Sequence, residues 1–382
     1  MARICTSLLL LLAFATPARA QAAAPPPPDF DRLLARAMEL HQAGDLLGAV
    51  DTYKAALAID PTRADALSNL GAAYVRLGQF DDAIAQYELA LKRDPMSSAV
   101  RLNIALAYYK SARPQHAIPQ LKRVLASGPD TRNAYLILAD CYLQTGQDQE
   151  VVALLRPREQ MFAGDLAFAY LLGTALLYAG DTVEGQKYVD RVFGAGESAE
   201  AHLLLGIAHL GQHDYGSAKT ELELALKLNP KLATAHSLYG RSLLALGEQG
   251  PAEQAFRREL DSNVNDFEAN LQLGNIRKGA QRFDEASIYL ERATTIRPRD
   301  LTARKLLAAL RLQTGKTEEA LGMLEAIVKE APDVVEVHVL LATAYNRLNR
   351  KEDAQREREI VDRLNAEAQA RQPGAIKKGS EK

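Results

Sequence analysis

The sequence predicts an all-α solenoid built from antiparallel helix pairs. Small residues recur along the chain with a period of about 34 residues, and glycines and prolines recur at two other places in the same period. Between these positions, apolar residues recur at i, i+3, i+4 and i+7, the spacing of an amphipathic helix. A fixed period of this length is typical of a repeat array, which grows in one dimension instead of around a single core.

The repeat is traced through ten units. The spacing is the same throughout, except that the step from the fifth unit to the sixth is shorter by a single residue. The units begin at Phe30, Ala64, Ser98, Arg132, Leu166, Ala199, Ala233, Phe267, Leu301 and Val335.

Each unit carries marks for two helices. Position 8 is always Gly or Ala, and position 20 is Ala, Gly or Val, so two helices can cross closely there. A large side chain would overpack that crossing at a cost of about 1–3 kcal/mol. Glycine at position 15, as at Gly78, ends the first helix, and proline at position 32, as at Pro95, ends the second.

This pattern resembles the tetratricopeptide repeat, a helix–turn–helix unit of about 34 residues. The resemblance covers Phe30 to about Asn365. It implies a right-handed superhelix in which the first helices line a concave groove used for protein–protein recognition. It also implies that positions 2, 5, 6, 9, 12 and 13 of each unit face that groove.

The fourth unit departs from the pattern. Pro157 falls inside its expected second helix, and the following unit is the short one. Because proline lacks an amide donor, it breaks or kinks a helix, so we expect a bend between Arg156 and Leu166. We therefore divide the array into residues 30–165 (units 1–4) and 166–365 (units 5–10 with a charged capping helix). Residues 366–382 are expected to be a helix end and a disordered tail.

The N-terminus is interpreted as an export signal. Arg3 precedes an apolar run, and Ala18 to Ala20 form a small-x-small cleavage site. Residues 1–20 are therefore a predicted signal peptide and residues 21–29 a proline-rich linker, and the mature protein is expected to be periplasmic or secreted. After cleavage, Cys141 is the one cysteine that remains. It is either an inert residue packed in a helix or a reactive or pairing thiol, and inert packing is favoured.

No catalytic, cofactor or metal signature is found. Partial glycine-rich sequences lack a first or third glycine and a strand before them, and no metalloprotease or hydrolase motif occurs. His202, His209 and His213 are the best metal candidates, but they occupy packing and turn positions, so we expect no metal. The net charge of −2 gives no indication of nucleic-acid binding.

The candidate binding residues lie at the positions that the resemblance turns toward the groove. Two asparagines in successive early units form a short ladder that can bind backbone amides, or they are simply solvated. In the central units these positions become apolar, which indicates either a binding surface or packing between repeats. The predicted groove residues are Asn69, Asn103, Leu136, Tyr170, Leu177, Tyr178, Leu203, Ile207, Leu210 and Leu244.

The predicted function is that of a non-catalytic scaffold or adaptor in the bacterial cell envelope, which binds a segment of a protein or peptide partner in its groove. The alternative is a ligand-binding or accessory protein for polysaccharide assembly or secretion. The partner's identity and the oligomeric state stay open.

Overall fold

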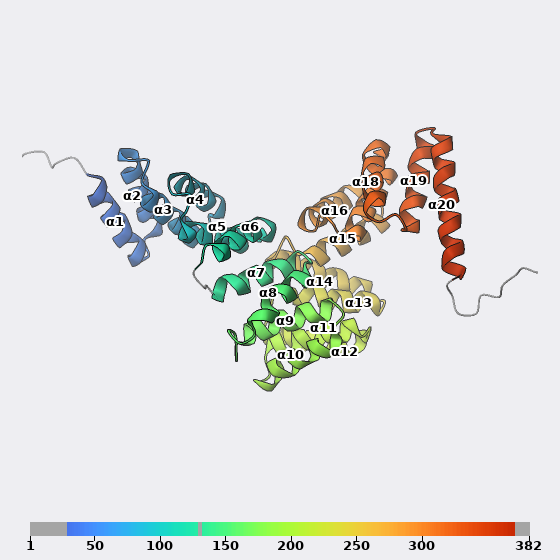
Figure 1. The fold of residues 1–382 in the computed structure, drawn as a ribbon, viewed down its shortest axis with the longest axis horizontal. Helices are drawn as coiled ribbons and strands as arrows, with labels where there is room; N and C mark the ends of the chain where they lie inside the picture. The colour runs from blue at the N-terminus through green and yellow to red at the C-terminus, as the bar shows by residue number, and fades with distance from the viewer. Residues whose placement is uncertain (1–28, 129–131, 371–382) are drawn as a thin grey trace, which may run out of the picture.

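The computed structural model describes residues 29–128 and 132–370, and these ranges form a continuous array of α-helices joined in pairs (Figure 1). The first helices of the units are α1 (Phe30–Ala43), α3 (Ala64–Arg76), α5 (Ser98–Lys110), α7 (Arg132–Gln144), α9 (Leu166–Tyr178), α11 (Ala199–Gly211), α13 (Ala235–Ala245), α15 (Phe267–Gly279), α17 (Leu301–Gln313) and α19 (Val335–Arg347). The second helices are α2 (Leu46–Ile59), α4 (Phe80–Arg93), α6 (Pro114–Ala126), α8 (Asp148–Leu155), α10 (Thr182–Gly194), α12 (Tyr215–Leu228), α14 (Gln249–Ser262), α16 (Phe283–Ile296), α18 (Thr317–Glu330) and α20 (Lys351–Ala370).

The helix starts confirm the predicted repeat. Every second helix begins at position 17 of its unit, and every first helix except α13 begins at the first position. Helix α13 begins two residues late, at Ala235, because Thr234 adopts a left-handed backbone with φ of 65°. The backbone N–H of Thr234 donates to the buried Glu259 carboxyl group at 2.9 Å, which holds this conformation.

The small residues at position 8 are required by the helix crossings. A Cβ atom at Gly173 would lie 2.8 Å from Cβ of Tyr188, and one at Gly240 would lie 2.8 Å from the ring of Phe256. Both distances are shorter than carbon–carbon contact allows, so each glycine lets the second helix of its unit approach the first. The predicted reason for a small residue at this position is confirmed.

The predicted break at Pro157 is also confirmed. Helix α8 has 8 residues and ends at Leu155, and the chain continues through a short 3₁₀ turn at Arg156–Arg158 before α9 begins. The Phe162 ring fills the space left by the missing helical turns and stacks on Phe168 with 5.0 Å between ring centroids.

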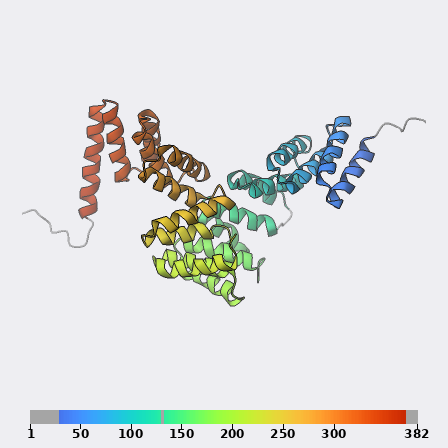
Figure 2. The same ribbon diagram turned by 180° about the vertical axis from the view of Figure 1, so that it is seen from behind.

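The curvature of the array is not uniform. Helices α1–α6 form one arm and α15–α20 a second, and both rise from a strongly curved base of α7–α14 (Figures 1 and 2). The largest buried core extends from Ala105 to Leu238 and passes through this base without a gap at α8. At the C-terminal end, α20 covers α19 with a mostly charged sequence and buries only Ala354.

Several predicted segments lie outside the described residues: the signal peptide, the linker apart from Asp29, and residues 371–382. Within the described ranges, no helix is both long enough and apolar enough to span a lipid bilayer.

Candidate functional site

The curved base, together with the adjoining helices α5 and α15, forms a half-open chamber of about 630 Å³ on the inner face of the array. Its helical lining comes from first helices, α5, α7, α9, α11, α13 and α15, together with Asp148 at the start of α8. The loops before α13 and α15, and Arg297 after α16, complete the wall. The concave face is therefore built from first helices, as the repeat pattern predicted.

The chamber is closed by hydrogen bonds between segments that are far apart in the sequence. We call them the closing contacts. Gln115 Nε2 donates to Ile296 O at 2.7 Å, and Asn265 Nδ2 donates to Ala112 O at 2.9 Å. The Arg297 guanidinium donates to the backbone carbonyls of Leu143 and Gln144, both at 3.3 Å, and stacks over the Phe267 ring. These contacts join the third and fourth units to the seventh and eighth.

One part of the chamber wall is apolar. Helices α7, α9, α11 and α13 present aliphatic and tyrosine side chains at the inner-face positions. They are Leu136, Ile137, Leu143, Tyr170, Leu171, Tyr178, Ile207 and Leu238. An enclosed surface of this kind gains free energy when it is covered, at roughly 25 cal/mol per Å².

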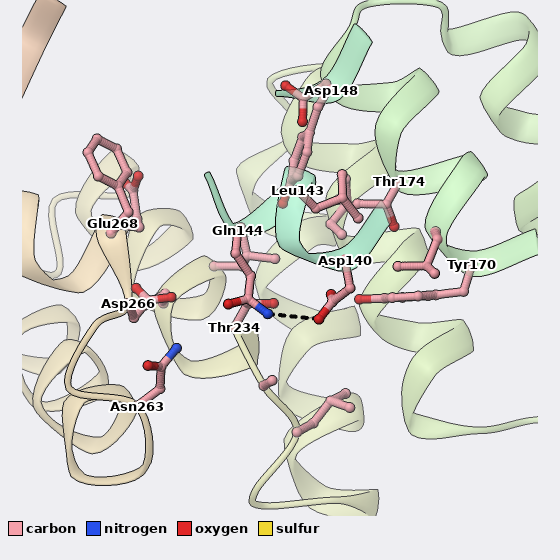
Figure 3. A pocket seen from close by; sticks show the side chains of 18 of the residues that line it. Asp140, Leu143, Gln144, Asp148, Tyr170, Thr174, Thr234, Asn263, Asp266 and Glu268 are labelled. Carbon is pink, nitrogen blue, oxygen red and sulfur yellow. Dashed lines mark hydrogen bonds between the residues drawn. The ribbon is translucent and has the colours of Figure 1, made fainter. Parts of the chain in front are cut away.

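The remaining wall is polar and mainly acidic. Its carboxyl groups belong to Asp140, Asp148, Glu200, Asp266 and Glu268, and its two guanidinium groups belong to Arg241 and Arg297. Figure 3 shows Asp140 and Tyr170 on one side of the chamber and Asp266 and Glu268 on the other. The walls therefore combine a hydrophobic surface with an excess of negative charge.

The enclosure changes the protonation of these groups. Burial raises the pKa of Asp140, although hydrogen bonds from Tyr109 at 2.6 Å and Gln144 at 2.7 Å oppose the rise. Burial also raises the pKa of Glu268, opposed by the nearby Arg241, and raises the pKa of Tyr178 to about 12. Since burial penalises the charged form, each carboxylate here is stabilised by any positive charge that enters.

The predicted groove residues fall into three groups. Leu136, Tyr170 and Tyr178 line the chamber, and Ile207 lies behind its surface, because it is only 2% exposed and belongs to the buried core. Leu177, Leu203 and Leu210 are 7%, 0% and 2% exposed and belong to the buried core, which is the packing role that the sequence had left open. Leu244 is half-buried against the core between α13 and α14, and Asn69 and Asn103 are half-buried on α3 and α5, in the N-terminal arm.

The charged groups of the chamber were missed by the sequence analysis. Glu200 and Glu268 stand at position 2, and Asp140 and Arg241 at position 9, so their inward orientation was available from the repeat. Asp148, Asp266 and Arg297 lie at helix ends and loops, where the repeat pattern assigns no inner face. These last residues reach the chamber only because the array closes on itself.

The three candidate histidines do not gather into one site. His202 is buried between Glu221 at 2.6 Å and Glu197 at 3.1 Å, whereas His213 contacts the Tyr215 hydroxyl at 3.0 Å. His209 lies 3.5 Å from Asp214. Across residues 29–128 and 132–370, no three His, Cys, Asp or Glu side chains are arranged to hold a metal ion.

Comparison with known proteins identifies the repeat. Models of the tetratricopeptide repeat match residues 40–107, 277–338 and 311–373, and a second such model matches residues 102–156 and 203–266. The chain is similar to anaphase-promoting complex subunit 3 of Schizosaccharomyces pombe, with 25% identity over 151 residues. That match covers 40% of this chain and 23% of the relative, so the chain spans about a quarter of that protein.

Two solved structures align with most of the chain. The crystal structure of the APC/C hetero-tetramer Cut9–Hcn1 aligns with a TM-score of 0.54 and 13% identity, over 88% of this chain and 73% of that one. The crystal structure of yeast Tom70 aligns with a TM-score of 0.38 and 14% identity, over 88% and 76% of the two chains. The first of these likenesses supports the fold, a superhelix of consecutive helix pairs.

Proposed function

The chain belongs to the tetratricopeptide repeat family, and we propose that it is a non-catalytic scaffold of the bacterial cell envelope that binds a segment of a partner protein in the chamber of its curved base. The observation that supports this most strongly is the chamber itself. Repeat units fill the described residues, 29–128 and 132–370, and the inner faces of the third to the eighth unit converge on one half-open chamber.

The size and chemistry of the chamber suit a few side chains of an extended or helical segment. Five large apolar side chains of the chamber wall are half-buried or partly exposed, so covering them contributes at most on the order of 7–15 kcal/mol before costs. Association itself costs about 4–15 kcal/mol. The balance is consistent with micromolar binding, which suits a scaffold that exchanges its partners.

The envelope location rests on the sequence of residues 1–20, with its arginine, apolar run and Ala18 to Ala20 cleavage site. The measurement is mass spectrometry of the protein isolated from the envelope fraction. A mature N-terminus at Gln21 supports export, whereas an intact N-terminus in the cytoplasmic fraction contradicts it.

The binding role is tested by affinity capture with variants of the chamber. Leu136→Glu and Tyr178→Glu place charge on the apolar wall, and Tyr178 is already 39% exposed, so the fold tolerates the change. The matched control is Val183→Glu on α10, because Val183 is 73% exposed and lies outside the chamber.

We expect the two chamber variants to lose the captured partner and the control to retain it, with equal helical content by circular dichroism. If the chamber variants capture the same proteins as the unmodified chain, the partner does not bind in the chamber.

A further inference from the structure

The polar wall of the chamber carries more negative than positive charge. Its five carboxyl groups face two guanidinium groups, those of Arg241 and Arg297. The Arg297 guanidinium is already engaged by two backbone carbonyls and the Phe267 ring in the closing contacts. When these groups are ionised, the chamber therefore has negative charge that its own cations do not balance.

Asp140 and Asp266 each accept their closest hydrogen bonds at one carboxylate oxygen. Tyr109 and Gln144 both donate to Asp140 Oδ2, which leaves Oδ1 available to a ligand. The Ser237 hydroxyl and the Ala269 amide both donate to Asp266 Oδ1, at 2.6 and 2.8 Å, and the Glu268 amide lies beside the same carboxylate. Asp266 is only 7% exposed, so this carboxyl group is held inside the wall of the chamber.

Two further buried oxygens line the chamber without a well-formed hydrogen bond. Thr174 is 4% exposed, and its Oγ1 atom has the Tyr170 hydroxyl group as its polar neighbour. Asp148 Oδ1 is also buried and accepts no hydrogen bond among the described residues. Figure 3 shows Thr174 on the same side of the chamber as Asp140 and Tyr170. A buried oxygen with no donor costs about 1–3 kcal/mol, and a ligand with N–H groups removes that cost.

The ligand that satisfies these groups is a cation with several N–H donors and an apolar stem. An ammonium group has three donors and no acceptor, which suits a cluster of unpaired oxygen acceptors. A stem of methylene groups suits the adjoining wall of Leu136 and Tyr170, which are both half-buried. A carboxylate ligand has only Arg241 to meet it and faces five acidic groups.

We propose that the chamber binds a lysine side chain of the partner segment, with its ammonium group at Asp140 and Thr174 and its methylene stem along Leu136 and Tyr170. Asp266 and Glu268, on the opposite side, add negative charge that attracts the same cation. This inference rests on the proposed function, because it names the chemistry of the segment that the scaffold holds.

The test uses three small probes on the full chain. The n-hexylammonium ion carries the charge of lysine on a somewhat longer apolar chain, n-hexanol is its neutral counterpart, and n-hexanoate is its anionic counterpart. Dissociation constants are measured by ligand-observed NMR at neutral pH and low salt. We expect n-hexylammonium to bind at least about tenfold more tightly than n-hexanol. A factor of ten corresponds to about 1.4 kcal/mol, which is close to the contribution of one hydrogen bond to a charged group.

Variants assign the binding to the chamber. The double variant Asp140→Asn, Asp266→Asn keeps both side-chain shapes and is expected to weaken n-hexylammonium binding at least about tenfold, with n-hexanol unaffected. The control is Glu223→Gln on α12, an exposed carboxylate outside the chamber, which is expected to leave all three probes unchanged. Equal affinity for the charged and neutral probes, no binding of n-hexylammonium, tighter binding of n-hexanoate, or an unaffected double variant would each overturn the proposal.

Competition separates this inference from the proposed function. If the partner is captured but n-hexylammonium does not bind, the scaffold stands and the lysine assignment is wrong. If n-hexylammonium binds as expected but does not displace the partner, the lysine site of the chamber exists and the partner binds elsewhere.

Discussion

Removing two of the closing contacts should open the curved base. In the double variant Gln115→Ala, Asn265→Ala, the hydrogen bonds to Ile296 O at 2.7 Å and to Ala112 O at 2.9 Å are lost. Each such bond contributes about 0.5–1.5 kcal/mol net, so the two together contribute about 1–3 kcal/mol to closure. Because 1.4 kcal/mol is a factor of ten, the open population should rise by roughly 5- to 150-fold.

The assay is a distance measurement between two spin labels by pulsed electron paramagnetic resonance. Cysteines replace Met96 and Ile288 as label sites, because these residues are 84% and 56% exposed. Met96 lies between α4 and α5, and Ile288 lies in α16, so the two labels flank the closing contacts. A Cys5→Ser background leaves the buried Cys141 as the one thiol besides the two label sites. We expect one narrow distance distribution for the unmodified chain and an added longer component in the double variant.

The control for this experiment is Gln160→Ala, Asn275→Ala. It removes the same two residue types from exposed positions whose side chains make no hydrogen bond within the described ranges. If the Gln115→Ala, Asn265→Ala variant has the same distance distribution as the unmodified chain and the control, the closing contacts do not hold the base together, and the stiffness of the packed helices alone sets its curvature.

Three further predictions concern stability and reactivity. Burial raises the pKa of Glu259 from an ordinary 4.5 to about 7, so the folded state holds this proton more tightly than the unfolded state does. The free energy of unfolding should therefore fall by on the order of 3 kcal/mol as the pH rises from about 4.5 to about 7. In denaturant titrations, Glu259→Gln should reduce this dependence of stability on pH. Gly173→Ala meets Cβ of Tyr188 at 2.8 Å, whereas Gly322→Ala meets nothing within 4 Å, so the first variant should be about 1–3 kcal/mol less stable than the second in urea unfolding. Burial raises the pKa of the Cys141 thiol, so a disulfide reagent should modify it only under unfolding conditions.

The repeat and its helix boundaries were predictable because their causes are local. A small residue at position 8, a glycine between the helices and a proline after them act within one unit, and so does Pro157, which ends α8 early. The late start of α13 was not predictable in this way. It depends on Glu259, which is 25 residues from Thr234 in the sequence and meets it only in the folded unit.

The candidate site was only partly predictable for the same reason. The repeat register gave the inward positions of Leu136, Tyr170 and Tyr178, which do line the chamber. It did not show that Leu203 and Leu210, at inward positions of α11, are used entirely in packing. Closure by Arg297 and Asn265 joins residues that are 153 positions apart in the sequence, and a pattern that is confined to one repeat unit contains no information about such contacts.

The most direct test of the central claim, that a partner binds inside the curved base, is site-specific photo-crosslinking in envelope extracts. A photoreactive phenylalanine is placed at Tyr178 inside the chamber and, separately, at Val183 on the outer face of the same unit. The account predicts one defined crosslinked protein from position 178, reduced by excess unlabelled scaffold, and none from position 183. Equal crosslinking from both positions, or a defined product from position 183 alone, would contradict it.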